Sequence, residues 1–270
     1  MNLDDINQRG LVLLGCGKMG SALLAGWLNG GVAASSVWVV DPFPSDWVTG
    51  TGVHVNEGIP NAPAVVVIAV KPQMMGEALP NLTALGGGDT MFVSIAAGTP
   101  ISRFEAELGA TSPIVRTMPN TPAAVGAGIT AIIGNSVCST VHLDLAEHLM
   151  AAVGQTVRLE NEDQMDPVTA VSGSGPAYVF HLIECLAQAG ESEGLSAELS
   201  MKLAKATVAG AGALVAQAED DPTQLRINVT SPKGTTEAAL GVLMDQESGL
   251  PPLMQRAVEA AANRSRELKS

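Results

Sequence analysis

The residue pattern with the clearest chemical meaning lies near the start of the chain, where glycines are spaced as G-x-G-x-x-G between an apolar run and an amphipathic one. Between a strand and a helix, Gly15 permits a tight turn, Gly17 lets the backbone approach a pyrophosphate, and Gly20 lets helix pack on strand. The free amides and dipole of the helix start then stabilise the phosphate charge. The pattern predicts a dinucleotide-binding site. The alternative interpretation is a tight strand–helix turn that binds no ligand. The expected contacts are Gly15, Cys16, Gly17, Lys18, Met19 and Gly20.

A carboxylate follows roughly 20 residues further on, at the spacing where it accepts hydrogen bonds from the adenine ribose hydroxyls. This residue, Asp41, would repel the extra phosphate of NADPH, and no arginine lies nearby in the sequence to bind that phosphate. Pro42 and Phe43 follow, so the loop could also turn Asp41 away. We expect NADPH or NADH as the cofactor, with Asp41 favouring NADH.

Three further segments follow predicted strands at their carboxyl ends, where open α/β sheets bind ligands. Lys71, in Val70-Lys71-Pro72, either approaches the cofactor or is a solvated loop lysine. Ala96-Ala97-Gly98 carries only small side chains, which let a flat ring lie close. Asn120 lies between two prolines and offers an amide to nicotinamide or substrate, although its surroundings also suit an ordinary turn.

Two segments in the second half place hydroxyls and glycines before helices. Ser172–Pro176 is either a well-made helix start, with Ser174 as a cap, or an anion pocket. In Thr230–Glu237, backbone amides, the helix dipole and Lys233 could together hold a carboxylate. Plain capping is the alternative there, because hydroxyls before a glutamate are what any helix start prefers.

The order of apolar runs predicts how these segments are held. Expected strands are Leu11–Leu14, Val37–Val40, Val65–Val70, Met91–Ile95, Ile114–Thr117 and Ile129–Ile133, with helices at Gly20–Asn29 and Thr140–Val153. This alternation predicts a mainly parallel sheet wound on both faces. The later part predicts only helices, at Pro176–Ala189, Ala197–Ala218, Thr235–Met244 and Pro251–Leu268. We expect an α/β domain over residues 1–160 and an all-α domain over residues 161–270.

The expected helix Ala197–Ala218 is rich in alanine and contains Gly210 and Gly212. Glycine within a helix costs about 1 kcal/mol relative to alanine, so close helix contact should recover the loss. Such bare faces are hard to bury within one chain's second half. The pattern therefore predicts a dimer formed through the helices.

Composition excludes several classes of function. A formal net charge of −13 makes nucleic acid and anionic membrane surfaces poor partners, while a small anionic substrate remains compatible with local cations. We find no signal peptide and no apolar stretch of the ~18 residues expected of a membrane span. Neither the three cysteines (Cys16, Cys138 and Cys185) nor the histidines show metal-ligand spacing, and nothing requires a disulfide. We expect a cytoplasmic protein without a metal site.

Collected together, these segments resemble the pyrroline-5-carboxylate reductase family over nearly the whole chain. The motifs that carry the resemblance are Gly15–Gly20, Ala69-Val70-Lys71-Pro72, Ala96-Ala97-Gly98, Met118–Pro122, Ser172–Tyr178 and Ser231–Thr236. The resemblance implies a Rossmann domain followed by an all-α dimerisation domain, whose dimers often assemble into larger rings such as a decamer. It also implies reduction of 1-pyrroline-5-carboxylate to L-proline with NADPH or NADH.

The same resemblance assigns roles to individual residues. Besides the glycine pattern and Asp41, the implied cofactor contacts are Asn56, Ala69, Val70, Lys71, Pro72, Ala96, Ala97 and Asn120. The implied substrate residues are Asn120, Glu162, Ser174, Gly175, Asn228, Lys233, Gly234, Thr235 and Thr236. Thr236 is the implied catalytic residue, forming a hydrogen bond with the ring nitrogen. The chain departs from a common family pattern at Asp41, which bears on coenzyme choice, and at Lys233, which bears on carboxylate affinity.

The residue chemistry agrees, because hydride transfer to a protonated imine needs neither a nucleophile nor a strong acid, and orientation supplies most of the rate. One alternative is a 3-hydroxyacid dehydrogenase using Lys202 or Lys205 as acid, although the neighbouring residues lack a polar asparagine partner. Another is a non-catalytic nucleotide sensor, which the intact glycine–threonine segments of the second half argue against.

Overall fold

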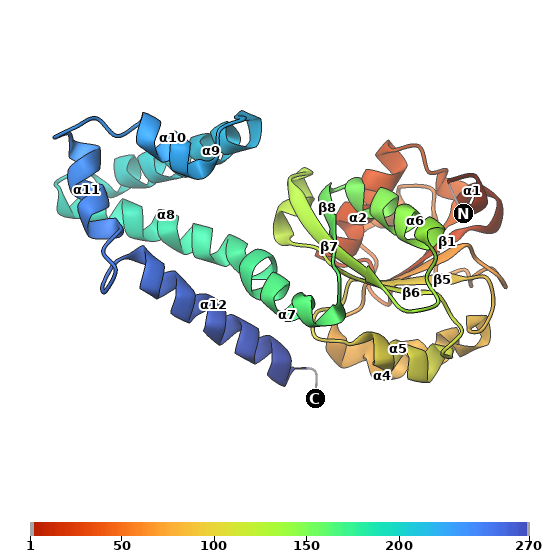
Figure 1. Ribbon diagram of the computed structural model, residues 1–270. Coiled ribbons are helices and arrows are strands. Elements are labelled where there is room, and N and C mark those ends of the chain that lie inside the picture. Colours follow the sequence, from red (N-terminus) through yellow and green to blue (C-terminus); the bar gives the residue numbers. More distant parts are fainter. Residues whose placement is uncertain (1–2, 269–270) are drawn as a thin grey trace. The chain divides into compact units, whose positions relative to one another are not determined.

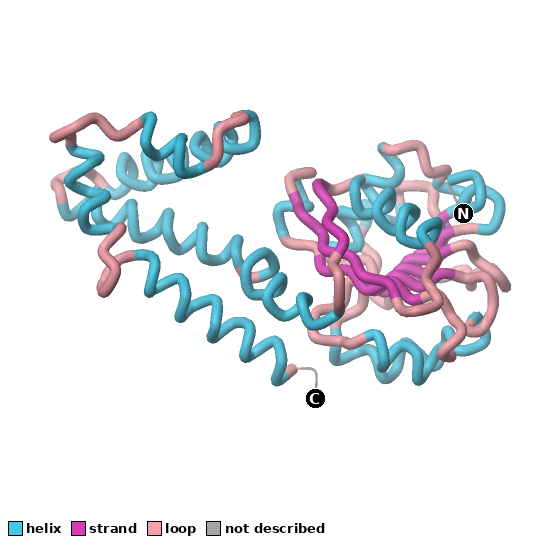
Figure 2. Tube along the Cα trace, in the orientation of Figure 1, coloured by secondary structure: helices cyan, strands magenta, loops and turns pink. Residues whose placement is uncertain are grey.

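The computed structural model describes residues 3–268 and divides into two compact units (Figures 1 and 2). The first unit holds residues 3–174 together with 261–268, and the second holds residues 175–260. These units are structural, whereas the functional boundary expected at residue 160 stays a prediction. Each unit is described by itself below.

An eight-stranded sheet lies at the centre of the first unit, in the order β3-β2-β1-β4-β5-β6-β7-β8 (Figure 2). All neighbouring strands are parallel except β6 and β7, which confirms the mainly parallel sheet. The order reverses at β1, which pairs with both β2 and β4, and such a switch point opens a crevice at the carboxyl ends of the strands. The strands are β1 (Leu11–Leu14), β2 (Val37–Val40), β3 (His54–Val55), β4 (Val65–Ile68), β5 (Met91–Ser94), β6 (Ile114–Met118), β7 (Gly128–Gly134) and β8 (Gly154–Arg158).

The central strands are apolar throughout because both faces of the sheet are covered. Successive side chains of a strand point to opposite faces. Leu11 and Leu13 accordingly join the hydrophobic cluster on one face, while Val12 and Leu14 join the cluster on the other. Figure 1 shows α2 and α6 over one face and α4 and α5 over the other. The helices of this unit are α1 (Leu3–Arg9), α2 (Lys18–Asn29), α3 (Asp46–Thr49), α4 (Met75–Ala78), α5 (Ile101–Leu108), α6 (Thr140–Ala151) and α7 (Met165–Val168).

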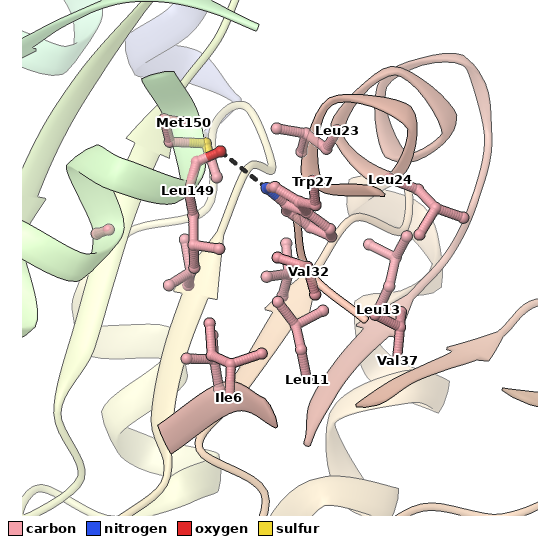
Figure 3. Packing of buried hydrophobic residues seen from close by; sticks show 14 of the residues in the cluster. Ile6, Leu11, Leu13, Leu23, Leu24, Trp27, Val32, Val37, Leu149 and Met150 are labelled. Carbon is pink, nitrogen blue, oxygen red and sulfur yellow. Dashed lines mark hydrogen bonds between the residues drawn. The ribbon is translucent and has the colours of Figure 1, made fainter. Parts of the chain in front are cut away.

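Trp27 joins the two helices on the first face (Figure 3). Its ring is fully buried against Leu23, Val32 and their neighbours, and its Nε1 donates a hydrogen bond of 2.8 Å to the carbonyl oxygen of Leu149. A buried indole N–H without a partner would be costly, so this bond selects one packing of α2 on α6. It thereby fixes the helix whose first turn carries the glycine pattern.

The second unit contains helices only. They are α8 (Gly175–Ser192), α9 (Ala197–Gln217), α10 (Pro222–Asn228), α11 (Thr235–Leu243) and α12 (Leu250–Glu267), the last of which ends in the first unit. Helices α8 and α9 approach closely at Gly190, where a Cβ would lie 3.0 Å from the Oγ of Ser200. The close contact expected at Gly210 and Gly212 is not made within the described chain, because the space beside both glycines is open.

Few side chains of this unit are buried, notably Ala187, Ser200 and Ala204. Its large apolar side chains are exposed instead, including Val179, Phe180, Leu182, Leu186, Leu199, Leu203, Leu214, Val215, Ile227, Val242, Leu243, Leu253 and Met254. An exposed apolar surface of this extent marks a protein contact, and so small a core does not offset the entropy of ordering five helices. The helices therefore need a partner surface.

Helix α9 corrects one expectation from the sequence. By length and composition alone it is long and apolar enough to cross a membrane, although only 11% of its apolar window is buried here. The expectation rested on the absence of an uninterrupted apolar run. Helix α9 contains Lys202 and Lys205, yet the mean hydropathy of its apolar window, 1.2, is high enough for a membrane span. A protein partner accommodates these lysines at its rim more readily than a bilayer does.

We predict that the protein is a dimer, or a multiple of a dimer, at low micromolar concentration, because the apolar faces of α8–α12 cannot be buried within one chain. Light scattering coupled to size-exclusion chromatography measures the mass directly. A stable monomer with full activity would contradict the prediction.

Candidate active site

The glycine pattern forms a tight turn between β1 and α2, as predicted. Gly15 has φ +89°, and a Cβ there would lie 2.9 Å from backbone atoms of the loop after β4, at Ala69 and Val70. A Cβ on Gly20 would lie 2.6 Å from the carbonyl oxygen of Gly15. At Gly17, by contrast, the Cβ position has no described atom within 4 Å. The turn is therefore packed on its inner side and open on the side where a pyrophosphate would approach α2.

Asp41 faces this turn. Its Oδ2 accepts a hydrogen bond of 2.6 Å from the amide of Cys16, and its Oδ1 accepts one of 2.8 Å from the amide of Phe43. Asn56, in the left-handed region with φ +55°, holds the backbone of Asp41 from the other side. Its Oδ1 accepts from the amide of Asp41 at 3.0 Å and its Nδ2 donates to the Asp41 carbonyl at 2.8 Å. Pro42 and Phe43 thus do not turn the carboxylate away from the glycine turn.

The thiol of Cys16 lies within the same turn but has no reactive character. Burial raises the pKa of the Cys16 thiol, and the nearby Asp41 charge raises it further, while a hydrogen bond with Ser21 acts in the opposite direction. Because its pKa is raised, the group stays a neutral thiol near pH 7. Only the thiolate is a good nucleophile, so Cys16 is unreactive. Cys16 therefore serves the turn through its backbone amide.

A cavity of about 290 Å³ opens beside β1 and β2, on the face of the sheet that carries Leu14. Its lining is mainly aliphatic and includes the polar side chain of Asn56, an arrangement that suits a flat heteroaromatic ring. The lining residues are Val12, Leu14, Val40, Asn56, Gly58, Ile59, Asn81 and Leu82.

The loops after β4 and β5 reach the same edge of the sheet. Lys71 is exposed and precedes a short 3-10 helix, Pro72–Met74. After β5, the amide of Ala96 donates to Ser94 Oγ at 3.2 Å, while Ala97 is exposed. These residues lie where the sequence places cofactor contacts, and their roles as contacts stay predictions.

Asn120 is engaged in the structure of the loop after β6. Its Oδ1 accepts from the amide of Ile129 at 2.9 Å, and its Nδ2 donates to the hydroxyl of Ser172 at 3.3 Å. Beside it, a Cβ on Gly173 would lie 2.7 Å from the Cε of Met118. The Met118–Pro122 segment and the Ser172–Pro176 segment, which lie far apart in the sequence, are therefore in contact.

Arg116 is a residue that the sequence reading missed. It lies on β6 with its side chain only 3% exposed, and its Nη1 donates to Glu162 Oε1 at 2.6 Å. The same carboxylate oxygen accepts from the amide of Ile101, the first residue of α5, at 2.9 Å. Glu162 thus joins β6 to the helix that follows Ala96-Ala97-Gly98. A single charged residue inside an apolar strand is the sequence signal that would have found Arg116.

The Ser172–Pro176 segment differs from the expected helix start. Residues Thr169–Gly173 form a π-helical turn between α7 and α8, and the amide of Ser174 donates to the carbonyl of Thr169 at 2.8 Å. The chain is thus helical before as well as after Ser174, so the Ser174 amide is engaged and an anion pocket there would have to use other donors. Gly175 is the first residue of α8.

In the second unit, the turn before α11 matches its prediction as a helix start. Lys233 adopts φ +59°, and its amide donates to the Oε2 of Glu237 at 2.6 Å, which locks the turn onto the helix. Gly234 is the N-cap residue, so Thr235 and Thr236 stand in the first turn. Asn228, at the end of α10, bonds to Gln224 and Asp220.

The structure therefore groups the predicted site residues in two sets. The glycine pattern, Asp41, Asn56 and the loops after β4, β5 and β6 meet at the carboxyl edge of the sheet in the first unit. Asn228 and the segment Lys233–Thr236 belong to the second unit. Among the residues whose positions are described, no three of His, Cys, Asp and Glu gather as metal ligands would.

Comparison with known proteins decides the family. The profile described as pyrroline-5-carboxylate reductase dimerisation matches residues 162–268, and one described as NADP oxidoreductase, coenzyme F420-dependent, matches residues 10–98. The pyrroline-5-carboxylate reductase of Pseudomonas aeruginosa is 39% identical over 264 residues, which cover 96% of both chains. This chain belongs to the pyrroline-5-carboxylate reductase family.

Solved structures of the family agree in fold. A pyrroline-5-carboxylate reductase from Coxiella burnetii shares 35% identity and a TM-score of 0.91, covering 97% of this chain and 99% of that one. The Plasmodium falciparum pyrroline carboxylate reductase, solved with NADP bound, shares 30% identity and a TM-score of 0.82, covering 98% and 99%. The Rossmann-type sheet and the helical dimerisation domain are thereby confirmed. The 3-hydroxyacid dehydrogenase and nucleotide-sensor alternatives are set aside.

Two glycine substitutions separate packing from cofactor binding. Gly20→Ala forces a Cβ onto the Gly15 carbonyl and should destabilise the protein by ~1–3 kcal/mol, visible as a lower melting temperature. Gly17→Ala meets no described atom, so its melting temperature should match wild type while NADH binds at least tenfold more weakly. Thermal unfolding and fluorescence titration of NADH check both. Wild-type NADH affinity in Gly17→Ala would contradict the predicted pyrophosphate approach.

Proposed function

We propose that this chain reduces 1-pyrroline-5-carboxylate to L-proline with NAD(P)H, as the last step in making proline. The observation that carries the proposal is the presence in one chain of this family of an open glycine turn for a dinucleotide and a hydroxyl-bearing helix start for an imino acid. NAD(P)H supplies the hydride when bound. The residues of the chain bind the cofactor and the imine, orient them toward each other and exclude water from them.

The cofactor is held, in this proposal, by the glycine turn and the loops at the carboxyl edge of the sheet. The pyrophosphate meets the amides at the start of α2, where the helix dipole favours its charge. The open side of Gly17 supports this arrangement. The adenine occupies the aliphatic cavity beside Asn56, and Ala69–Pro72, Ala96, Ala97 and Asn120 line the remainder.

The substrate carboxylate is held at the start of α11. The amide of Thr235 donates to the carboxylate, the charge of Lys233 offsets the net negative charge of the chain, and the first turn of α11 adds its dipole. The amide of Gly234 donates to the carbonyl oxygen of Ser231 at 3.0 Å, so Gly234 contributes its backbone conformation at the N-cap. The left-handed backbone of Lys233, fixed by Glu237, supports a preformed turn. The proposed substrate set is completed by Asn228, Ser174, Gly175, Asn120 and Glu162.

Thr236 is the proposed catalytic residue. The ring nitrogen of the protonated imine has no lone pair, so its N–H donates to the hydroxyl oxygen of Thr236, and this bond selects which face of the imine receives the hydride. As the nitrogen loses its positive charge and gains a lone pair, the hydroxyl donates to that lone pair, an interaction made only as hydride transfer proceeds, which stabilises the transition state more than the ground state. No proton needs to be stored on an acidic side chain, because the imine enters already protonated.

We further propose a preference for NADH. NAD(P) binding follows from the family, and the orientation of Asp41 supports the finer choice. Its carboxylate faces the glycine turn with both oxygens engaged by amides and retains lone pairs for ribose hydroxyls. A 2′-phosphate in the same place would be repelled by this charge.

The helical half is the dimerisation domain of the family, which points to a homodimer. We propose that dimers assemble further into a ring, such as a decamer, and that the protein works in the cytoplasm. Its thiols support the latter, because none of the cysteines in the described part is paired.

One assay tests the reaction. Oxidation of NADH and of NADPH, followed at 1-pyrroline-5-carboxylate concentrations up to saturation, should require the imine and yield proline. Cofactor oxidation without dependence on the imine, or cofactor binding without turnover, would overturn the proposal.

We predict that Asp41→Ser increases kcat/KM with NADPH relative to NADH by at least tenfold, because it removes the charge that repels the 2′-phosphate. Asp46→Ser, a nearby acidic residue at the first turn of α3, is the matched control and should leave the ratio unchanged. A hundredfold preference of the wild type for NADPH would show the inference from Asp41 to be wrong.

We predict that Thr236→Ala lowers kcat by roughly ten- to a hundredfold, because removing one hydrogen bond costs ~1–3 kcal/mol. Thr236→Ser keeps the hydroxyl and should retain most of the turnover. NADH affinity should be unchanged in both. Full turnover in Thr236→Ala together with a lower melting temperature would make the hydroxyl a helix-capping group only.

A further inference from the structure

We propose that the C-terminal turn of α12, through Ser265 and Leu268, is a positioning element for the loop Ala96–Gly98 that receives the nicotinamide. The inference rests on the proposed function, because it assigns a role within the same reaction. No family motif in the sequence includes these residues. The proposal is built from three contacts, all within the first unit.

The strand order places the nicotinamide half of the cofactor. The glycine turn follows β1, and Asp41, the proposed partner of the adenine ribose, follows β2 on one side of it. On the other side of β1 come β4 and then β5. A dinucleotide whose pyrophosphate lies at β1 and whose adenine half lies toward β2 extends its other half over the carboxyl ends of β4 and β5. The loop after β5 is Ala96–Gly98.

The C-terminal turn supports that loop. Gly98 has φ +75°, a conformation that glycine adopts without strain. A Cβ on Gly98 would lie 3.4 Å from the Cβ of Leu268 and 3.5 Å from its carbonyl oxygen. The C-terminal turn therefore packs directly on the loop backbone. Without it, Gly98, the most flexible type of residue, would face solvent beside the reacting ring.

A buried hydrogen bond fixes the turn. Ser265 is 5% exposed, and its hydroxyl donates to the Oδ1 of Asp166, itself 3% exposed, at 2.8 Å. Asp166 lies in α7, four residues beyond Glu162, which accepts from the amide of Ile101. The segment between β8 and α8 thus holds both flanks of the loop. Glu162 holds the start of α5 directly, and Asp166 acts through Ser265 and Leu268 on Gly98.

The functional consequence follows from the sensitivity of hydride transfer to geometry. A displacement of about 1 Å between reacting atoms can cost on the order of a hundredfold in rate. The adenine and pyrophosphate contacts lie on other loops, so losing the C-terminal support should affect turnover much more than cofactor affinity. Ser265 and Leu268 touch neither substrate nor cofactor in this account and are positioning residues.

The test compares Ser265→Ala with Arg266→Ala in the full-length protein. Arg266 is exposed on the same turn and bonds only to Asn263 in the described contacts, so it is the matched control. NADH-binding sites are counted by fluorescence titration, and kcat with 1-pyrroline-5-carboxylate is expressed per site. We expect Ser265→Ala to lose about tenfold in kcat per site with NADH affinity within twofold of wild type. Arg266→Ala should match wild type, and Ser265→Thr should recover most of the loss.

A second variant, ending at Arg264, removes both positioning residues and should lose at least as much turnover per site. Wild-type kcat per site in Ser265→Ala and in the shortened chain overturns the proposal, whatever happens to their melting temperatures, because a purely structural role lowers the number of sites and not the rate at each. Wild-type protein without imine-dependent turnover would instead refute the proposed function.

Discussion

The buried charge of Arg116 is the constraint on which the region around the site depends. A guanidinium taken out of water inside a sheet is tolerated only with a hydrogen-bonded partner, and removal of such a partner typically costs 3–5 kcal/mol. Glu162 is that partner, and its carboxylate also accepts the first amide of α5. The path of the chain after β8, the start of α5 and the carboxyl end of β6 are thereby fixed together. These polar contacts hold the loops at the sheet edge relative to one another.

The sequence was sufficient for most of the sheet. Runs such as Val65–Ile68 are apolar at every position, and only a strand covered on both faces needs that pattern. The glycine turn was also predictable, because a Cβ at Gly15 or Gly20 would collide with neighbouring backbone atoms, so only glycine fits these positions. The short strand β3 and the edge strand β8 were missed for the opposite reason. β3 has two residues, and β8, Gly154–Arg158, is largely exposed, so neither shows a clear apolar period.

The remaining misses concern interactions across long distances in the sequence. Asn120 contacts Ser172, and Arg116 pairs with Glu162. Neither contact can be predicted from one segment alone, because each segment is also compatible with an ordinary loop or strand. The π-helical turn before α8 was hidden for a related reason, because glycines and serines there are typical of a loop. In the helical half, Gly210 and Gly212 led us to expect close helix contact. The space beside both glycines is open within this chain, so the contact that they predict has to be made by another chain.

The chemistry explains why the proposed site needs no acid or base at the reacting atoms. Hydride addition to a protonated imine neutralises the positive charge on nitrogen, so the reaction needs no acid to donate a proton. A thiolate or amine nearby would compete with the hydride as a nucleophile for the same carbon. Burial keeps the Cys16 thiol protonated and inert beside the turn. The rate must then come from holding two flat rings in one geometry, and rigidity takes the place of acid–base groups. Left-handed turns, the Arg116–Glu162 ion pair and small side chains at strand ends are how this chain supplies rigidity. These features, and not a cluster of reactive residues, are what the described structure concentrates at the edge of its sheet.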